Sequence, residues 1–208
     1  MAAIRWMQFR GDDIIAAGRV CRCGVGHVWH GDASMSRIVL LDTETTGISY
    51  RMGDRIIEIG AVEMIDGRLT GREYHTYLQP DHPVHWAARR VHGISDAMLI
   101  GKPRFASQAE SLLDFVRGSE MVAHNAAFDT GFIDNELRLM GHGSSLAEHC
   151  RITCSLKLAR ARFPGMPNKL DDLLQRFAIS HQRNKHGALL DAQLLAQVLM
   201  RLRPGVPA

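Results

Sequence analysis

Residues 38–47 read Ile38-Val39-Leu40-Leu41-Asp42-Thr43-Glu44-Thr45-Thr46-Gly47. The four apolar residues are typical of a short buried strand, which runs directly into two carboxylates. Side chains alternate along a strand, so Asp42 and Glu44 project together from its end. Buried carboxylates repel each other unless a positive charge lies between them. The stretch therefore predicts a cation site, although an acidic pair that only meets water remains the alternative here.

Two further strand-like runs follow, at residues 55–65 and 68–78, and Asp66-Gly67 separates them. Asp-Gly favours a type I′ turn, because both central residues of that turn take positive φ. We therefore expect the first three strands to form one meander. Glu58 and Glu63 lie in this hairpin, where we expect them to face solvent.

The second half of the chain alternates expected helices and strands. The helices are expected at residues 86–93, 106–117, 127–140, 156–163, 169–177 and 187–202, and the strands at 121–125 and 150–155. A meander followed by such alternation is typical of an α/β fold with a mixed sheet flanked by helices. The expected domain covers residues 37–203, and a short tail, residues 204–208, follows it.

Length and charge indicate one soluble domain. The chain has 208 residues, with 25 Lys and Arg against 22 Asp and Glu, so its formal net charge is +3. This mildly basic balance is compatible with a polyanionic partner without requiring one. No apolar run approaches the roughly 18 residues that cross a bilayer, and the N-terminus lacks the apolar core of a secretion signal. We expect a cytoplasmic protein with no membrane partner, and its four cysteines fit a reducing compartment.

Residues 1–36 lack a clear period and allow three interpretations. Four potential zinc ligands lie there, although their spacing matches no common zinc motif: Cys21, Cys23, His27 and His30. The segment could instead be a poorly structured extension. The third interpretation is a start-site artefact, with natural translation beginning at Met35.

Three more polar residues lie near the ends of expected elements. Asp129 falls in the first turn of the helix that follows strand 121–125, and His186 and Asp191 lie at the start of the last helix. Sites collect at such ends in α/β sheets, and four carboxylates at close range need cations to stay ionised. A negative charge also interacts favourably with a helix N-terminus, so structural roles for both aspartates stay open. His186 alone could be a surface histidine.

Three ordered motifs resemble those of the DEDDh family of 3′–5′ exonucleases. They are residues 42–47, quoted above, then His124-Asn125-Ala126-Ala127-Phe128-Asp129, and His186-Gly187-Ala188-Leu189-Leu190-Asp191-Ala192. Similarity extends over about residues 38–202, and the proofreading exonucleases of bacterial replicases look most similar. The resemblance implies an RNase H-like fold, in agreement with the order of elements above.

The resemblance implies hydrolysis of phosphodiester bonds with two divalent cations, Mg²⁺ or Mn²⁺. The ions would be held by Asp42, Glu44, Asp129 and Asp191. His186 would take a proton from the attacking water, a role that suits an imidazole whose ordinary pKa is about 6.5. The spacing of five residues from His186 to Asp191 separates this group from tyrosine-based relatives.

In the family, a Val-His-Gly-Ile segment lies against the terminal nucleotide. Val91 and His92 are therefore candidates for contacts to the last base and sugar, with helix-end capping by His92 as the alternative. Within the motifs, Thr45, His124 and Asn125 are further candidates. Relatives carry Pro-Glu-Ala shortly before this segment, where this chain has residues 86–88, Trp-Ala-Ala. The glutamate contact to the terminal sugar is thus missing or replaced.

The implied function is a 3′–5′ exonuclease that proofreads DNA by acting on single-stranded 3′ ends. Trimming of RNA ends is the nearest alternative, and a non-catalytic nucleic-acid-binding or scaffold subunit is an alternative of another class. All four carboxylates and the histidine are present, which favours catalysis over a scaffold. The implied partner is the alpha subunit of DNA polymerase III. Relatives bind it through a tail beyond the domain, and we expect that contact to be absent here because the sequence stops at Ala208.

Overall fold

The computed structural model describes residues 37–180 and 185–203. The expectations for the N-terminal extension, including its four zinc-ligand candidates and the start at Met35, lie outside the described residues. So do residues 181–184 of the expected polar loop and the short tail, residues 204–208. Within the described part of the chain, no helix is long and apolar enough to cross a membrane.

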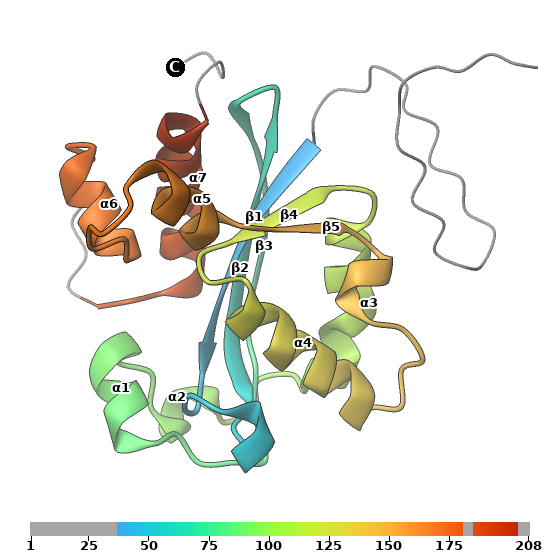
Figure 1. Cartoon of the computed structure of the whole chain (residues 1–208). Helices are drawn as coiled ribbons and strands as arrows, with labels where there is room; N and C mark the ends of the chain where they lie inside the picture. The colour runs from blue at the N-terminus through green and yellow to red at the C-terminus, as the bar shows by residue number, and fades with distance from the viewer. Residues whose placement is uncertain (1–36, 181–184, 204–208) are drawn as a thin grey trace, which may run out of the picture. The chain divides into compact units, whose positions relative to one another are not determined.

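Five strands form one mixed sheet in the order β3-β2-β1-β4-β5 (Figure 1). They are β1 (Arg37–Thr45), β2 (Ile56–Ile65), β3 (Arg68–Tyr77), β4 (Glu120–Ala123) and β5 (Arg151–Cys154). The first three pair antiparallel and form the predicted meander, whereas β4 runs parallel to both β1 and β5. The strand with the acidic pair is therefore the centre of the sheet.

In the described part of the chain, seven α-helices flank this sheet: α1 (Trp86–His92), α2 (Asp96–Leu99), α3 (Phe105–Val116), α4 (Ala127–Leu139), α5 (Ser155–Arg162), α6 (Leu170–Arg176) and α7 (Ala188–Leu202). Two short 3₁₀ helices, η1 (Tyr50–Met52) and η2 (Leu146–Glu148), lie in connecting segments. The sequence did not predict α2, η1 or η2. Each has only three or four residues, too few for a hydrophobic period to show.

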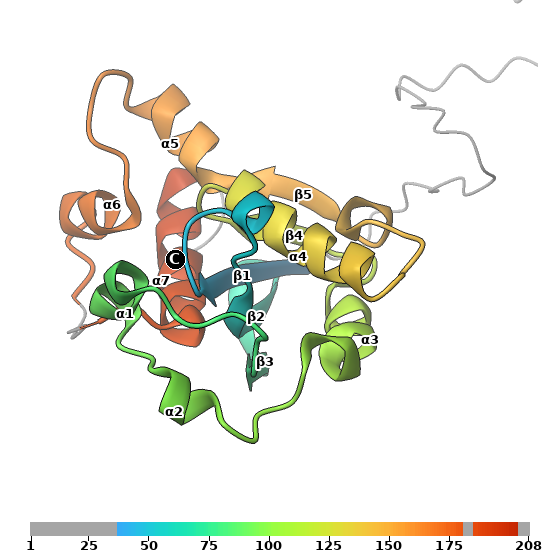
Figure 2. The same ribbon diagram turned by 90° about the horizontal axis from the view of Figure 1, so that it is seen from below.

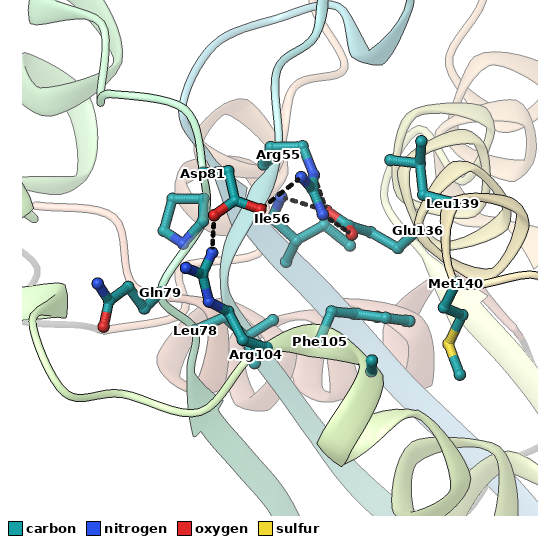
Figure 3. Close-up of a pocket in the computed structure, with 12 residues that line it drawn as sticks. Arg55, Ile56, Leu78, Gln79, Asp81, Arg104, Phe105, Glu136, Leu139 and Met140 are labelled. Atoms are coloured by element: carbon teal, nitrogen blue, oxygen red, sulfur yellow. Dashed lines mark hydrogen bonds and ion pairs between the residues drawn. The ribbon is translucent and has the colours of Figure 1, made fainter.

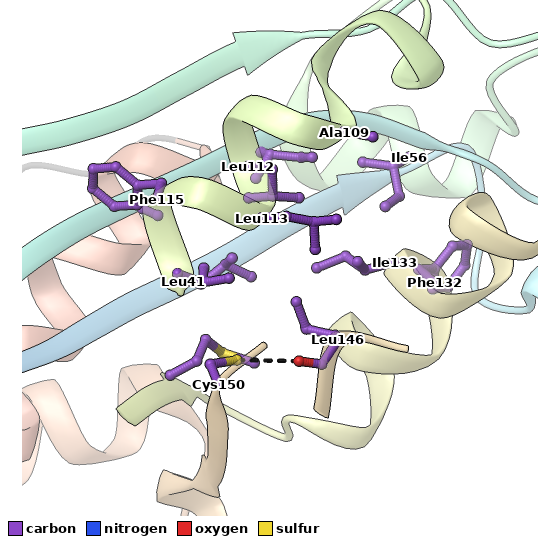
Figure 4. Packing of buried hydrophobic residues seen from close by; sticks show 14 of the residues in the cluster. Leu41, Ile56, Ala109, Leu112, Leu113, Phe115, Phe132, Ile133, Leu146 and Cys150 are labelled. Atoms are coloured by element: carbon purple, nitrogen blue, oxygen red, sulfur yellow. Dashed lines mark hydrogen bonds between the residues drawn. The ribbon is translucent and has the colours of Figure 1, made fainter. Parts of the chain in front are cut away.

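The two faces of β1 pack against different helices. Val39 and Leu41 belong to a core cluster with α3 and α4 (Figure 4), and Ile38 and Leu40 to one with α7. Figure 2 shows α7 on one side of the sheet and α3 and α4 on the other. Burying one such leucine contributes about 2 kcal/mol. By the same alternation, the even-numbered carboxylates of β1 face the α7 side.

Glu58 and Glu63 do not face solvent, so that expectation was wrong. Their exposed fractions are 3% and 2%. Glu63 accepts hydrogen bonds from Arg37 (Nε to Oε1, 2.6 Å) and Arg72 (Nη1 to Oε1, 2.8 Å). Since β2 lies inside the sheet with helices over both faces, its polar side chains are buried and need partners from elsewhere in the chain.

Candidate active site

A pocket of about 380 Å³ lies where β1 and β4 end, and it gathers the residues that the motifs pointed to. Its lining consists of Asp42, Thr43, Glu44, His124, Asn125, Phe128, Asp129, Lys169, Leu170, Asp171, His186 and Asp191. These residues come from β1, from the turn after β4, and from the starts of α4, α6 and α7. The five residues expected to carry the chemistry therefore share one cavity.

The start of α7 reaches the pocket because it packs very closely on β2. Gly60 of β2 pairs in register with Asp42, and a Cβ on Gly60 would lie 2.1 Å from the backbone nitrogen of Leu189. Two residues earlier, Glu58 Oε2 accepts a hydrogen bond from the Ala188 backbone nitrogen at 3.2 Å. These contacts fix the first turn of α7 on the sheet, and Asp191 lies in that turn. Local sequence patterns point to neither contact, since Glu58 was expected to face solvent and Gly60 carries no signal of close packing.

His186 and Asp191 are in direct contact. Nδ1 of His186 lies 2.9 Å from Oδ2 of Asp191, and 39% of the histidine side chain is exposed. One potential ligand atom each from Glu44, His186 and Asp191 lies within 4.8 Å of the others. The two carboxylates of this set are close enough to hold one cation between them, and the histidine beside them keeps access to solvent.

Asp129 is hydrogen-bonded to the face of β1 opposite to the one that carries Asp42 and Glu44. Thr43, between the two acidic residues of β1, donates its hydroxyl hydrogen to Asp129 Oδ1 at 2.8 Å. Asn125 takes a φ of 71° in the turn that leads to α4, a left-handed conformation that asparagine tolerates better than most residues. Thr43 was not among the predicted site residues, although strand alternation places it on the α4 side.

Burial and mutual repulsion disfavour the ionised carboxylates. Burial raises the pKa of Asp42 well above its ordinary value, and Asp129, Glu44, Asp191 and Glu58 raise it further. Burial also raises the pKa of Asp129 to about 7, against the lowering effect of the Thr43 hydrogen bond. Divalent cations such as Mg²⁺ prefer carboxylate oxygens, and a bound cation would reverse these shifts. The donor set and its electrostatics therefore fit a divalent metal site.

The two candidates for contacts to the last nucleotide lie at the end of α1. Val91 is half-exposed, and its carbonyl accepts a hydrogen bond from the backbone nitrogen of His186 at 3.3 Å. His92 is buried, and its Nδ1 accepts from the Ile94 backbone nitrogen at 3.0 Å. Within the described residues its Nε2 makes no hydrogen bond of normal geometry. Burial lowers the pKa of His92, and the backbone of Thr45 partly offsets this.

His124 and Thr45 use their polar atoms inside the protein. The two ring nitrogens of His124 lie 3.0 Å from Ser155 Oγ and 3.0 Å from the Asn168 carbonyl oxygen, and burial lowers the pKa of this histidine. Thr45 donates its hydroxyl hydrogen to the carbonyl oxygen of Gly47. His124 therefore connects the end of β4 to the first residue of α5 and to the segment before α6.

A second pocket of about 400 Å³ carries charges that neutralise one another (Figure 3). Arg55 donates to both carboxylate oxygens of Glu136, at 2.8 and 2.5 Å. Arg104 pairs with Asp81 in the same cavity. The Arg55–Glu136 pair is largely buried and the Arg104–Asp81 pair is exposed, so the acidic groups of this pocket have cationic partners from the chain, in contrast to those of the carboxylate pocket.

A mixed sheet with carboxylates from β1, α4 and α7 in one pocket defines an RNase H-like nuclease that uses divalent cations. Residues 39–199 match the model of a family described as Exonuclease, and the chain belongs to this family. It is a 3′–5′ exonuclease of the DEDDh type, which confirms the resemblance and the fold class that the sequence predicted.

The chain is also similar to individual members of the family. DNA polymerase III subunit epsilon of Escherichia coli is 47% identical over 178 residues, which cover 83% of this chain and 73% of that protein. The Haemophilus influenzae subunit of the same name is 44% identical, with 82% and 68% covered.

Solved structures agree with this assignment. Exonuclease X in complex with 5′ overhanging duplex DNA is 28% identical, with a TM-score of 0.58 over 81% of this chain and 90% of that one. The nuclease domain of 3′hExo, a DEDDh family member bound to rAMP, is 16% identical and has a TM-score of 0.69 over 85% and 96%. At that identity the second likeness concerns the fold.

Proposed function

We propose that this exonuclease proofreads DNA synthesis by removing nucleotides from single-stranded DNA 3′ ends. The observation that carries the proposal is the gathering of Asp42, Glu44, Asp129 and Asp191 beside His186 in one pocket. The relatives named DNA polymerase III subunit epsilon favour DNA over RNA as the substrate. One fold neighbour recognises histone mRNA, so RNA trimming remains the second candidate to be tested.

The four carboxylates would hold two Mg²⁺ or Mn²⁺ ions, with Asp129 bound directly or through water. Such ions, when bound, activate the attacking water and stabilise charge on the leaving 3′ oxygen. His186 takes the proton as the water oxygen bonds to phosphorus and the bond from phosphorus to the 3′ oxygen breaks. The contact of its Nδ1 with Asp191 orients the ring, and its exposure allows it to reach water.

The residues around this centre would hold the terminal nucleotide. Val91 is half-exposed and would offer an apolar surface to the last base, whereas Nε2 of His92 is buried and would have to be uncovered before it could contact the sugar. Thr45, His124 and Asn125 lie at the ends of β1 and β4, where they would shape the site around the scissile phosphate. The hydrogen bond that His92 accepts from the Ile94 backbone nitrogen lies just past the end of α1 and supports the helix-end role, and the contact to the sugar stays a prediction.

Digestion of matched DNA and RNA oligonucleotides, labelled at the 5′ end, tests the substrate. With Mg²⁺ or Mn²⁺ present, we expect stepwise shortening from the 3′ end and faster loss of DNA. Faster loss of RNA would favour the second candidate. Absence of mononucleotide release with either cation would revive the non-catalytic alternative.

A His186→Ala variant tests the proton acceptor. Positioned general bases contribute about 10² to 10⁴ in rate, so we expect a loss in this range. Cation binding, measured by calorimetry, should stay near that of the unchanged protein. Full activity in the variant would contradict this role for His186.

The proposed partner is the alpha subunit of DNA polymerase III, in the cytoplasm. Support comes from the relatives, which are named as subunits of that polymerase. Co-purification of this chain with the alpha subunit of its own species is the test. Retention of the complex through gel filtration would support the partnership, and separate elution of the two proteins at micromolar concentration would count against it.

A further inference from the structure

Helix α1 exposes an aromatic and basic surface. Trp86, at its first position, is 65% exposed. The centroid of the Trp86 ring lies 5.6 Å from that of the His85 ring. Cζ of Arg90 lies over the Trp86 ring, 5.9 Å from its centroid. The helix sequence, residues 86–92, contains two arginines and no acidic residue. An exposed tryptophan beside a guanidinium group is a surface suited to nucleic-acid bases and phosphates.

This surface is tied to the active site at both ends of the helix. The backbone nitrogen of His85 donates to the Thr46 carbonyl oxygen at 2.8 Å, directly after the acidic strand. At the other end, the carbonyl oxygen of Val91 accepts a hydrogen bond from the backbone nitrogen of His186, and the Lys185 side chain lies against Gly93. Figures 1 and 2 both show α1 beside the start of α7. A strand of DNA whose end lies in the pocket would therefore pass close to α1.

We propose that Trp86 is a stacking platform for the unpaired base immediately upstream of the terminal nucleotide, and that Arg90 pairs with the phosphate beside it. This inference rests on the proposed function. Trp86 precedes Val91 by five residues, about 7.5 Å along the helix axis at 1.5 Å per residue. The two side chains also lie about 140° apart around the helix axis, so the DNA would curve around α1 between the terminal base and the next one upstream. Residues 86–92 include no aspartate or glutamate, so α1 presents no carboxylate to repel the DNA backbone.

Base-on-aromatic stacking is worth roughly 1–3 kcal/mol for each base, and it needs an unpaired base. The platform would therefore favour single-stranded or frayed 3′ ends over paired ones. Arg90 would add a salt-dependent phosphate contact, because pairing releases a counterion from the DNA. Trp86 and Arg90 would therefore contact the nucleotide one position upstream of the terminal nucleotide, which Val91 and His92 are proposed to contact.

The test compares two substrates on the full chain with Mn²⁺. One is a single-stranded oligodeoxynucleotide, and the other is the p-nitrophenyl ester of thymidine 5′-monophosphate, which has no upstream base. For Trp86→Ala, we expect the ratio of kcat/KM on the oligonucleotide to that on the ester to fall about tenfold. Trp86→Phe should keep most of the ratio. Arg90→Ala should make kcat/KM on the oligonucleotide less dependent on salt.

Matched controls lie at the start of β3, where Leu69 pairs with Met64 at the far end of the meander from the acidic pair. Leu69 is 48% exposed, so Leu69→Ala removes an exposed apolar side chain, and Arg68→Ala removes a charge. Neither should change the ratio. An unchanged ratio in Trp86→Ala, or an equal loss on both substrates, would overturn the platform. If the unchanged protein hydrolyses neither substrate, the proposed function falls as well.

Discussion

The buried carboxylates of this domain occur in two contrasting environments. Outside the pocket, three of them are paired with arginine, namely Glu63 with Arg37, Glu136 with Arg55 and Glu120 with Arg203, and Glu58 lies against His75. In the carboxylate pocket, what surrounds Asp42 is mainly other carboxylates. Burial works to raise the pKa of Glu120, but hydrogen bonds from Arg203 and Thr153 outweigh it and the pKa is lowered. For Asp42 and Asp129 the pKa is raised.

The difference shows where the protein supplies its own counter-charge and where it leaves that to a ligand. An arginine partner makes a buried carboxylate part of the folded structure, and the pair needs nothing further. A cluster of carboxylates with raised pKa values disfavours its own ionised form until a cation binds. The first environment therefore contributes to stability and the second to function.

The largest expected effect is a loss of activity when a carboxylate is removed from the pocket. Asp42→Asn removes a carboxylate from the pocket, and we expect exonuclease activity to fall on the order of a thousandfold or more. Without divalent cations the variant should be at least as stable as the unchanged protein, because a source of repulsion is gone. Rates on a labelled oligonucleotide and urea unfolding in EDTA measure the two quantities.

The matched change in the other environment is Glu136→Gln. It leaves the partly buried Arg55 without its carboxylate, so we expect a loss of about 2 kcal/mol in the free energy of unfolding. Activity of the folded variant should stay within about threefold of the unchanged protein. If both variants lost mainly stability, or both mainly activity, the distinction between the environments would not stand.

Gly60→Ala should disturb the active site without touching a carboxylate. The new Cβ would collide with the backbone of α7 at Leu189, so the helix that carries Asp191 must move. A displacement of about 1 Å at a catalytic group can cost on the order of a hundredfold in rate. Gly143→Ala is the control, since a Cβ there meets nothing within 4 Å. Full activity in Gly60→Ala would mean that α7 can shift without harm to the site.

Gly60 also marks the limit of what the sequence could predict. The three motifs, the order of strands and the alternation of β1 follow from local patterns, and they were enough to assemble the five chemical residues. The close approach of α7 to β2 depends on how two elements about 130 residues apart pack, and no local pattern records it. Gly60 therefore looked like an ordinary strand residue.

Glu58 and Glu63 show the same limit. Charged residues in a hairpin ordinarily face water, and no local pattern around these two glutamates indicates otherwise. Their burial depends on partners that only the fold brings near, such as the backbone of Ala188 for Glu58 and Arg37 for Glu63. Thr43 differs, because the period of a strand already placed it opposite the acidic pair, on the side where Asp129 arrives.

Stability should depend on pH and on cations together. The pKa of Asp129 is about 7 in the folded protein and about 4 in an unfolded chain. A raised pKa means stability that is present below pH 4 and is lost as pH rises through 7. Without divalent cations we expect the carboxylate to destabilise the fold more at pH 8 than at pH 5.5, and Mg²⁺ to offset this at pH 8.

Comparison with the Asp129→Asn variant separates the pH dependence of stability that comes from Asp129 from the pH dependence that comes from histidines. The difference in unfolding free energy between the two proteins, measured in EDTA, should change in favour of the variant as pH rises from 5.5 to 8. Added Mg²⁺ should stabilise the unchanged protein more than the variant. A difference that is constant with pH would mean that Asp129 ionises in the folded protein as it does in water.

The smallest effect should come from Thr43→Val, which keeps the shape of the side chain but removes its hydroxyl. The hydrogen bond from Thr43 lowers the pKa of Asp129, so its loss should raise that pKa further. At pH 7 more of the carboxylate is then protonated, and we expect about a fivefold lower rate at limiting Mn²⁺, recovered at higher pH or with more cation.

Glu120 offers the matched case, because Thr153 donates its hydroxyl hydrogen to that arginine-paired carboxylate. Thr153→Val should lower stability and leave the pH dependence of the rate unchanged, since Arg203 keeps Glu120 ionised. In Thr43→Val, the acid limb of the pH–rate profile should move to higher pH. A uniform loss of rate at all pH values would show that Thr43 only packs against α4, and that its hydroxyl does not tune Asp129 for a cation.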